Sequence, residues 1–463
     1  MNRRELRRKR RRRNQTIAYI VAGLILAAIV FGCVFIVRNI SGSAQGDSTR
    51  EEGSNVRTEG GIMADEENAD SDSPLQEQTE AFGQTGISGQ PEEPSETEPE
   101  AQTEGTAGQA ESSGEKTPEE QISSYVEAMS LEDKVAGLFI ITPEQLTGVE
   151  TAVQAGESTK EALEHYPVGG LVYFARNIQS DNQLKEMLAN TASYSRYPLF
   201  LGVDEEGGQV ARVAKALGLE NVGPMAEIGA SGNVDAAYEA GAAIASYLKE
   251  YGFNLDFAPV ADVLTNPDNT VIGDRSFGSD PVLVSQMVAA AVQGLQENGV
   301  SACIKHFPGH GNTAGDSHDG QVETDRTPEE MQAAEFLPFT AGIEAGVDMV
   351  MVGHISAPGL TDGDKVPASM NEKIITGVLR EQLGYNGVVI TDAMNMSAIT
   401  RYYAADEAAV KALKAGADMI LMPEDFTTAY NGVIAAVQDG TIAEERVNDS
   451  LKRIFRVKYG AGT

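Results

Sequence analysis

The residues best suited to chemistry lie between positions 304 and 319, where three of the chain's five histidines occur. The stretch starts at the end of an apolar run, 300–304, and continues into a loop rich in glycine. Its ionisable side chains are those of Lys305, His306, His310, Asp316, His318 and Asp319. Histidine titrates near neutral pH, so histidines grouped with carboxylates at a strand end indicate proton transfer or metal binding.

Two features of the chain favour proton transfer coupled to nucleophilic attack. Asp316 and His318 are separated by one residue in an irregular loop, where both side chains can lie on one side of the chain. The carboxylate then orients the imidazole and stabilises its protonated form, as in a catalytic dyad. Asp392 follows the apolar run 387–390 after a single threonine, and a carboxylate there is costly to bury unless it is paired or functional. A nucleophile and a separate proton donor are what the cleavage of a glycoside requires.

A divalent metal site is the chemical alternative, with His306, His310, His318 and Asp316 as ligands. Pro308 and the following glycine preclude an ordinary helix between the first two histidines. The first predicted strand also carries no His-x-His pair, which a metal-dependent barrel hydrolase usually shows. We therefore expect no metal and no other cofactor.

Eight short apolar runs alternate with amphipathic segments and must position these residues. The runs are 137–141, 169–174, 199–204, 254–261, 301–305, 349–354, 387–392 and 419–423. The clearest helical segments between them are 181–194, 282–297, 328–345, 371–383 and 406–415, and a last helix is expected over 443–459. This alternation over roughly 300 residues predicts an α/β fold, a single (β/α)₈ barrel of the TIM type.

A doubly wound open sheet is the alternative fold, but it needs a glycine-rich phosphate loop after the first strand, and 141–145 is not one. In a barrel the active site lies at the carboxyl ends of the strands. Polar residues gather at five of those predicted ends, within 204–212, 262–278, 305–306, 391–396 and at His354. We expect these residues to meet in one site.

The N-terminal quarter of the chain has a different composition. Residues 1–16 contain nine basic side chains and predict a cytoplasmic segment, and 17–37 are 21 residues without a charge or a proline, as a transmembrane signal anchor requires. A cleaved signal peptide and a lipoprotein at Cys33 are the alternatives. Residues 38–117 predict a disordered acidic linker, since 41–116 hold 19 acidic and 3 basic residues. The domain 118–463 is then expected outside the cytoplasm.

The net charge and the cysteines of the chain limit which partners and cross-links are expected. The formal net charge of −34 argues against nucleic acid as a partner. The buried strand predicted around Cys303 keeps that thiol from reaching Cys33, so no disulfide is expected within the chain. The membrane is expected to be contacted through 17–37, and the sequence predicts no particular oligomeric state.

Several motifs together resemble the bacterial β-N-acetylhexosaminidases of glycoside hydrolase family 3. They are Lys-His-Phe-Pro-Gly-His-Gly at 305–311, Asp-Ser-His at 316–318, Asp-Glu-Glu-Gly-Gly-Gln at 204–209, Asp-Arg-Ser-Phe-Gly at 274–278 and Thr-Asp-Ala-Met-Asn-Met at 391–396. The resemblance covers about 120–460, in the family's order. Two departures from the family pattern are Gln209, where many members have arginine, and the glutamate at 205, which is more often glutamine.

This resemblance implies a retaining enzyme that removes terminal β-linked N-acetylglucosamine, often from peptidoglycan fragments. It implies Asp392 as the nucleophile, His318 as general acid and base, and Asp316 as the residue that orients His318. The positions that match the family's sugar contacts are Asp204, Arg212, Arg275, Lys305 and His306. Peptidoglycan turnover at the cell membrane is the expected setting, with an N-acetylglucosamine-containing glycan or muropeptide as substrate.

Three other functions stay open. β-Glucosidases that resemble this barrel take their acid/base carboxylate from a second domain, and we expect no such domain here. Some relatives with the histidine dyad transfer the sugar to phosphate, and the residues do not separate a hydrolase from a phosphorylase. An inactive glycan-binding barrel predicts loss of the nucleophile or of the dyad, and all three residues are present.

Overall fold

The computed structural model describes residues 117–315, 320 and 322–460. Within these residues, no helix is both long enough and apolar enough to cross a bilayer. The predicted basic segment, the anchor at 17–37 and the linker up to 116 lie outside the described residues. So do Asp316 and His318. The first helix in the described part of the chain, α2, is capped reciprocally by Thr117 and Glu120.

The described residues form an eight-stranded parallel barrel that is nearly closed. Its order is β11-β9-β7-β6-β3-β2-β1-β12. The two end strands meet through a parallel bridge between Ile390 and Met419, so an open doubly wound sheet is excluded. The strands are β1 (Phe139–Ile141), β2 (Gly170–Tyr173), β3 (Phe200–Val203), β6 (Leu255–Asp256), β7 (Ser301–Phe307), β9 (Met349–Val352), β11 (Val388–Thr391) and β12 (Ile420–Leu421). Each lies within or overlaps one of the eight predicted runs.

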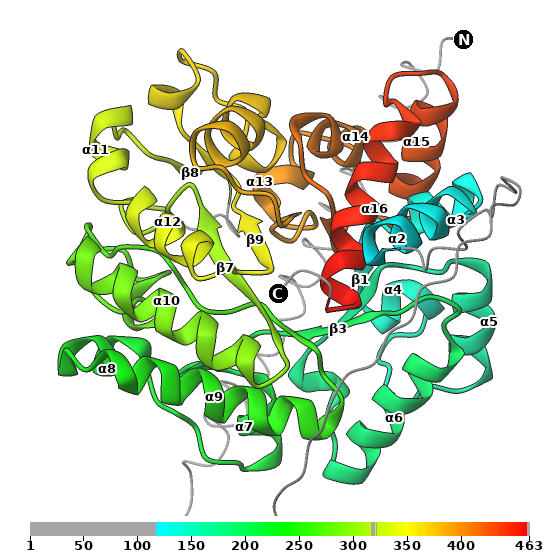
Figure 1. Cartoon of the computed structure of the whole chain (residues 1–463), viewed down its shortest axis with the longest axis horizontal. Helices are drawn as coiled ribbons and strands as arrows, with labels where there is room; N and C mark the ends of the chain where they lie inside the picture. The colour runs from blue at the N-terminus through cyan, green and yellow to red at the C-terminus, as the bar shows by residue number, and fades with distance from the viewer. Residues whose placement is uncertain (1–116, 316–319, 321, 461–463) are drawn as a thin grey trace, which may run out of the picture. The chain divides into compact units, whose positions relative to one another are not determined.

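Helices surround these strands on all sides (Figure 1). The main ones are α2 (Pro118–Glu127), α3 (Leu131–Ala136), α4 (Pro143–Thr147), α5 (Glu157–His165), α6 (Asp181–Tyr194), α7 (Arg212–Leu217), α8 (Met225–Ser231), α9 (Val234–Tyr251), α10 (Pro281–Glu297), α11 (Pro328–Ala333), α12 (Phe336–Glu344), α13 (Ser397–Thr400), α14 (Ala405–Ala415), α15 (Phe426–Gln438) and α16 (Glu444–Lys458). Two small sheets lie outside the barrel: β4 (Glu205–Gly207) with β5 (Val210–Ala211), and β8 (Val322–Glu323) with β10 (Ile355–Ser356).

Three predicted elements differ from the observed ones. The helix expected over 328–345 is two helices, because Pro338 cannot donate to the carbonyl of Ala334 and the helix breaks there. The strand expected over 254–261 pairs fully only at β6, since Pro259 has no N–H for the ladder. The segment expected as an ordinary helix over 371–383 is a π-helix, η5 (Lys373–Gln382).

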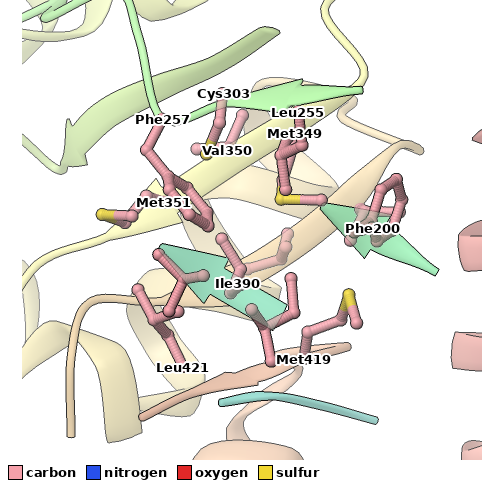
Figure 2. Packing of buried hydrophobic residues seen from close by; sticks show 14 of the residues in the cluster. Phe200, Leu255, Phe257, Cys303, Met349, Val350, Met351, Ile390, Met419 and Leu421 are labelled. Atoms are coloured by element: carbon pink, nitrogen blue, oxygen red, sulfur yellow. The ribbon is translucent and has the colours of Figure 1, made fainter. Parts of the chain in front are cut away.

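The barrel interior is filled by side chains from most of its strands. Figure 2 shows Phe200 of β3, Leu255 of β6, Met349 and Met351 of β9, and Ile390 of β11 packed against one another. All of these side chains are buried, as is Cys303 of β7, which is a free thiol. The barrel is therefore a packed core, and space for a ligand remains only at its ends.

A half-buried lysine at the end of α16, Lys458, leads to a prediction about stability. Lys458 donates to the carbonyl of Gly169 at 2.7 Å and lies 4.9 Å from the Phe200 ring centroid. Burial lowers the pKa of its ammonium group to about 7, whereas the unfolded chain has the ordinary value of about 10.4. Between these two pH values the unfolded state binds more protons, so rising pH favours the folded state.

We therefore expect the free energy of unfolding of the wild type to rise relative to Lys458→Met between pH 7 and pH 10. The relative gain is at most on the order of 4 kcal/mol, because the aromatic contacts partly stabilise the charged form. Urea unfolding of both proteins at pH 7, 8.5 and 10 measures the difference. A difference that stays constant over this range would contradict the prediction.

Candidate active site

A cavity of about 440 Å³ opens at the carboxyl ends of the barrel strands. Its size is typical of small-molecule sites. Its walls contain the five predicted sugar contacts and the predicted nucleophile: Asp204, Arg212, Arg275, Lys305, His306 and Asp392. Met351 and Leu421, which belong to the core in Figure 2, also line it. Six residues that are up to 188 positions apart in the sequence therefore share one cavity, while the predicted acid/base pair lies outside the described residues.

Two cations and two carboxylates form a compact cluster on one wall. The Lys305 Nζ atom lies 2.6 Å from Asp204 Oδ1 and 2.6 Å from Glu206 Oε1. Arg275 binds the same Glu206 carboxylate through two nitrogens, each at 2.7 Å. Burial acts to raise the pKa of Glu206, but Lys305 and Arg275 outweigh it and lower that pKa to about 2. The cluster is thus held together by charge-assisted hydrogen bonds between Lys305, Arg275 and the two carboxylates.

Arg212 is placed differently from the other cations. It is the first residue of α7, whose second and third backbone N–H groups donate to the Glu205 carboxylate at 2.7 and 2.9 Å. This capping fixes the start of the helix. Among the described residues, no hydrogen-bond or ion-pair partner is found for the Arg212 guanidinium, and its buried Nε atom has none. A cation in a cavity wall without a protein partner is suited to bind a polar ligand.

Asp392 immediately follows β11, and both neighbouring strands hold its backbone. Its own N–H donates to Val352, and the N–H of Met394 donates to Leu421. The Oδ1 atom accepts the N–H of Ala393 at 2.7 Å. Burial acts to raise the pKa of this carboxyl, but nearby positive charge, His354 first among its sources, outweighs it and lowers the pKa. Asp392 is therefore ionised at neutral pH, as a nucleophile must be.

The backbone after Asp392 forms a hydrogen bond with the side chain of His354, which is fully buried. A carbonyl can only accept, so His354 Nε2 carries a hydrogen and donates to Ala393 O at 2.9 Å. Its Nδ1 atom lies 2.8 Å from the Ser369 hydroxyl. The nucleophile therefore stands on a backbone that two strands and one histidine hold in place.

The motif at 305–311 places two imidazoles in the cavity wall, and the peptide between Lys305 and His306 is cis. His306 Nδ1 lies 2.7 Å from the Asp262 carboxylate. The first glycine of the motif, Gly309, has a φ of 132°, a backbone conformation that side chains rarely adopt. At Gly311, a Cβ would overlap the Val263 carbonyl. Both glycines are thus required by the path of the chain.

His310, in the cavity wall, carries a buried hydrogen-bond acceptor. The Thr313 hydroxyl donates to the His310 carbonyl at 2.9 Å, so the 2.8 Å contact with Nδ1 is a hydrogen bond that Nδ1–H donates. Burial lowers the pKa of this imidazole. Nε2 therefore carries a lone pair, and it is buried without a hydrogen-bond partner in the described part of the chain.

The two ends of the loop that carries the predicted dyad are anchored beside the cavity. Asn312 accepts a hydrogen bond from the Thr324 hydroxyl at 3.0 Å, which joins the segments before and after the loop. β8 on the returning side pairs in parallel with β10, which follows β9. The loop therefore leaves from and returns to the face of the barrel that carries Asp392.

Glu206, Asp262 and His354 stand at predicted strand ends but had no predicted role, and His310 was predicted only as a ligand of the alternative metal site. The first three carry the same signal as the residues with a predicted role: a polar side chain close after an apolar run. What separates them is contact. Glu206 and His310 line the cavity, whereas Asp262 and His354 act on residues that do.

No group of three or more His, Cys, Asp or Glu side chains among the described residues is arranged to hold a metal ion. The metal alternative stays untested, because two of its four ligands lie outside those residues. What the described groups can do is clear from their chemistry. The cavity wall holds the ionised carboxylate of Asp392. It also holds the guanidinium of Arg212, which has no partner among the described residues, two cations that are already paired with carboxylates, and two imidazole rings. Such a set binds a polyhydroxylated ligand and can attack it.

Comparison with known proteins agrees with this chemistry. The chain is 34% identical over 327 residues to β-hexosaminidase A of Pseudoalteromonas piscicida, covering 64% of this chain and 54% of that protein. It is 33% identical over 341 residues to β-hexosaminidase LpqI of Mycobacterium tuberculosis, covering 71% and 83%. The fold is similar to that of a glycoside hydrolase family 3 β-N-acetylglucosaminidase from Paenibacillus sp. str. FPU-7, with 38% identity, a TM-score of 0.66, and 72% and 62% of the two chains covered.

The chain thus spans about half the length of the first of these relatives and most of the second. The family model described as the glycosyl hydrolase family 3 N-terminal domain matches residues 130–457, which include every strand of the barrel and every described residue of the cavity wall. This chain belongs to glycosyl hydrolase family 3, a family of glycoside hydrolases.

Proposed function

We propose that the chain is a retaining exo-β-N-acetylhexosaminidase that hydrolyses terminal β-linked N-acetylglucosamine from cell-wall-type glycans. The observation that carries this proposal is one cavity in which the ionised Asp392 faces the unpaired Arg212 guanidinium and the Lys305 cluster. The names of the relatives support an acetamido sugar as substrate.

In the proposed mechanism, Asp392 attacks the anomeric carbon while the bond to the leaving oxygen breaks. His318, oriented by Asp316, gives its proton to that oxygen, and a covalent glycosyl-enzyme remains. His318 then removes a proton from water, which attacks the same carbon and releases Asp392. Asp204, Arg212, Arg275, Lys305 and His306 bind the hydroxyl and acetamido groups. The anchored ends of the 313–323 loop support this assignment, because they lie on the face of Asp392.

The proposal also includes a location. Residues 17–37 anchor the chain in the cell membrane with the N-terminus in the cytoplasm, and the acidic linker holds the barrel outside. The nine basic residues ahead of the apolar run support this orientation.

The test is an assay of the full-length protein after extensive chelation, on p-nitrophenyl β-N-acetylglucosaminide and on the matching β-glucoside. We expect release from the acetamido sugar alone, and no increase when phosphate is added. Phosphate-dependent release would identify a phosphorylase. Release from the glucoside alone would identify a β-glucosidase, and activity that returns only with zinc would support the metal site.

The proposed acid role of His318 predicts a dependence on the leaving group. In His318→Ala, activity on a glycan substrate should fall by roughly 10²- to 10⁴-fold, since its leaving alkoxide needs a proton. The first step with the p-nitrophenyl sugar should fall much less, because nitrophenolate leaves without protonation. Pre-steady-state release of nitrophenol measures that step. Equal losses on both substrates would contradict the acid role.

A further inference from the structure

A buried carboxylate behind the cavity wall has no role in the mechanism above. Asp262 follows the β6 segment; its side chain is fully buried and does not line the cavity. Its Oδ2 atom lies 2.7 Å from His306 Nδ1, and its Oδ1 atom accepts the His310 backbone N–H at 2.6 Å. Both oxygens lie 3.3 Å from the His306 backbone nitrogen. One carboxylate thus holds the two histidines of the 305–311 motif.

These contacts determine where the His306 ring carries its hydrogen. Burial acts to raise the pKa of Asp262, but His306 and the hydrogen bonds outweigh it, and the pKa is lowered. The group is therefore an ionised carboxylate that can only accept. Nδ1 of His306 must then carry a hydrogen whether the ring is neutral or charged, and Nε2 is the atom whose protonation can change.

We infer that Asp262 is a positioning residue of the active site, which fixes the orientation and the tautomer of His306 and so presents Nε2 to the substrate. The inference deepens the proposed function and rests on it only where activity is concerned. Asp262 also holds the backbone of His310, so the two imidazoles keep a fixed relation, with ring centroids 5.9 Å apart. His306 in turn contributes to the field that lowers the pKa of Asp392.

Replacing Asp262 by asparagine gives a definite expectation. The amide oxygen must face the His310 N–H, because a backbone donor at 2.6 Å cannot be satisfied by an NH₂ group. The amide nitrogen then faces His306 Nδ1 and donates to it. The ring must lose its Nδ1 hydrogen and carry one at Nε2 instead. In the variant, Nε2 of His306 would therefore be a fixed hydrogen-bond donor, whereas in the wild type it can accept a hydrogen bond.

The tautomer is read from the ¹⁵N signals of histidine side chains in the full-length protein, which has five histidines. The His306 signal is assigned by its absence in His306→Gln. We expect hydrogen on Nδ1 of His306 in the wild type, and on Nε2 alone in Asp262→Asn. Because the wild-type spectrum is informative by itself, the test does not depend on the folding of the variant.

Asp256→Asn is the matched control. Asp256 is also fully buried, six residues earlier in the same segment, and burial raises its pKa well above the ordinary value. Its Oδ1 atom accepts the Glu205 N–H, and its Oδ2 atom has no hydrogen-bond partner among the residues that the structure describes, so a neutral amide can replace the carboxyl group. This variant should keep the wild-type tautomer of His306.

Activity supplies the second measurement. We expect kcat/KM for the acetamido sugar to fall roughly 10- to 100-fold in Asp262→Asn, as for other partners that orient a histidine ligand, and less than about threefold in Asp256→Asn. A neutral wild-type His306 with its hydrogen on Nε2 would overturn the inference. So would an Asp262→Asn variant that keeps the Nδ1 hydrogen. A wild type inactive on every sugar tested would contradict the proposed function and leave the tautomer result valid.

Discussion

In the Asp392→Asn variant, release of N-acetylglucosamine should fall by roughly 10⁴-fold or more. The amide has the shape of the carboxylate and can still accept the Ala393 N–H, but it has no charge with which to attack the anomeric carbon. The fold should remain, because the backbone contacts of this residue to the neighbouring strands do not involve its side chain. Steady-state kinetics and a thermal unfolding curve separate the two effects.

The covalent intermediate offers a more specific measurement. During turnover of a slow substrate, intact-mass spectrometry of the wild type should detect a sugar adduct, and peptide mapping should place it on Asp392. The adduct should be absent in Asp392→Asn and present in Asp362→Ala, a control in which the altered side chain is 92% exposed. An adduct on another residue, or activity of Asp392→Asn within tenfold of the wild type, would rule out the assigned nucleophile.

Lys305→Met should lower the free energy of unfolding by roughly 3–5 kcal/mol, the cost of breaking a buried ion pair by removing one partner. The Lys305 side chain is 3% exposed and touches two carboxylates, one of which, Glu206, is itself 2% exposed. Methionine matches the length of the stem but leaves negative charge in the wall of the cavity. The same charge lies near Asp392, whose pKa Lys305 helps to lower, so turnover should also fall.

The loss of stability should depend on pH in one direction. In the folded wild type the pKa of Glu206 is lowered to about 2, from an ordinary value of 4.5. Its ion pairs therefore stabilise the fold above about pH 4.5, and this contribution disappears as the pH falls towards 2. Without Lys305 the pKa of Glu206 rises towards its ordinary value. The stability difference between the two proteins should thus shrink between pH 5 and pH 2.

Lys373→Met is the control for this experiment. Lys373 lies 2.6 Å from Asp362, the same distance as in the Lys305 pairs, but the side chains are 56% and 92% exposed. Such a pair contributes at most about 1 kcal/mol. Denaturant unfolding of the three proteins at several pH values makes the comparison. Equal losses in the two variants, or a difference that grows on acidification, would contradict the account of the Lys305 cluster.

Much of the architecture was predictable from the chain alone. The eight apolar runs each contain or overlap a barrel strand, because a strand buried on both faces is read directly as a short stretch of apolar residues. Periodicity also located several of the helices, but it overlooked Pro338 and Pro259, which interrupt a helix and a strand by lacking an N–H. The missing proline N–H groups decided those boundaries, and the spacing of apolar residues carries no information about them.

For the site, the sequence by itself determined which residues stand at strand ends, and the family resemblance of its motifs pointed to six residues that line the cavity. It did not determine their partners. Lys305 meets Asp204 and Glu206 across about a hundred positions, and Asp262 meets His306 across 44. The barrel brings the ends of β3, β6 and β7, which are consecutive in its strand order, close enough for such residues to form hydrogen bonds, and distance and burial then set their charges. Only the tertiary structure therefore decided that Glu206 and Asp262 are ionised, that Arg212 has no partner among the described residues, and that His306 meets Asp262 through Nδ1.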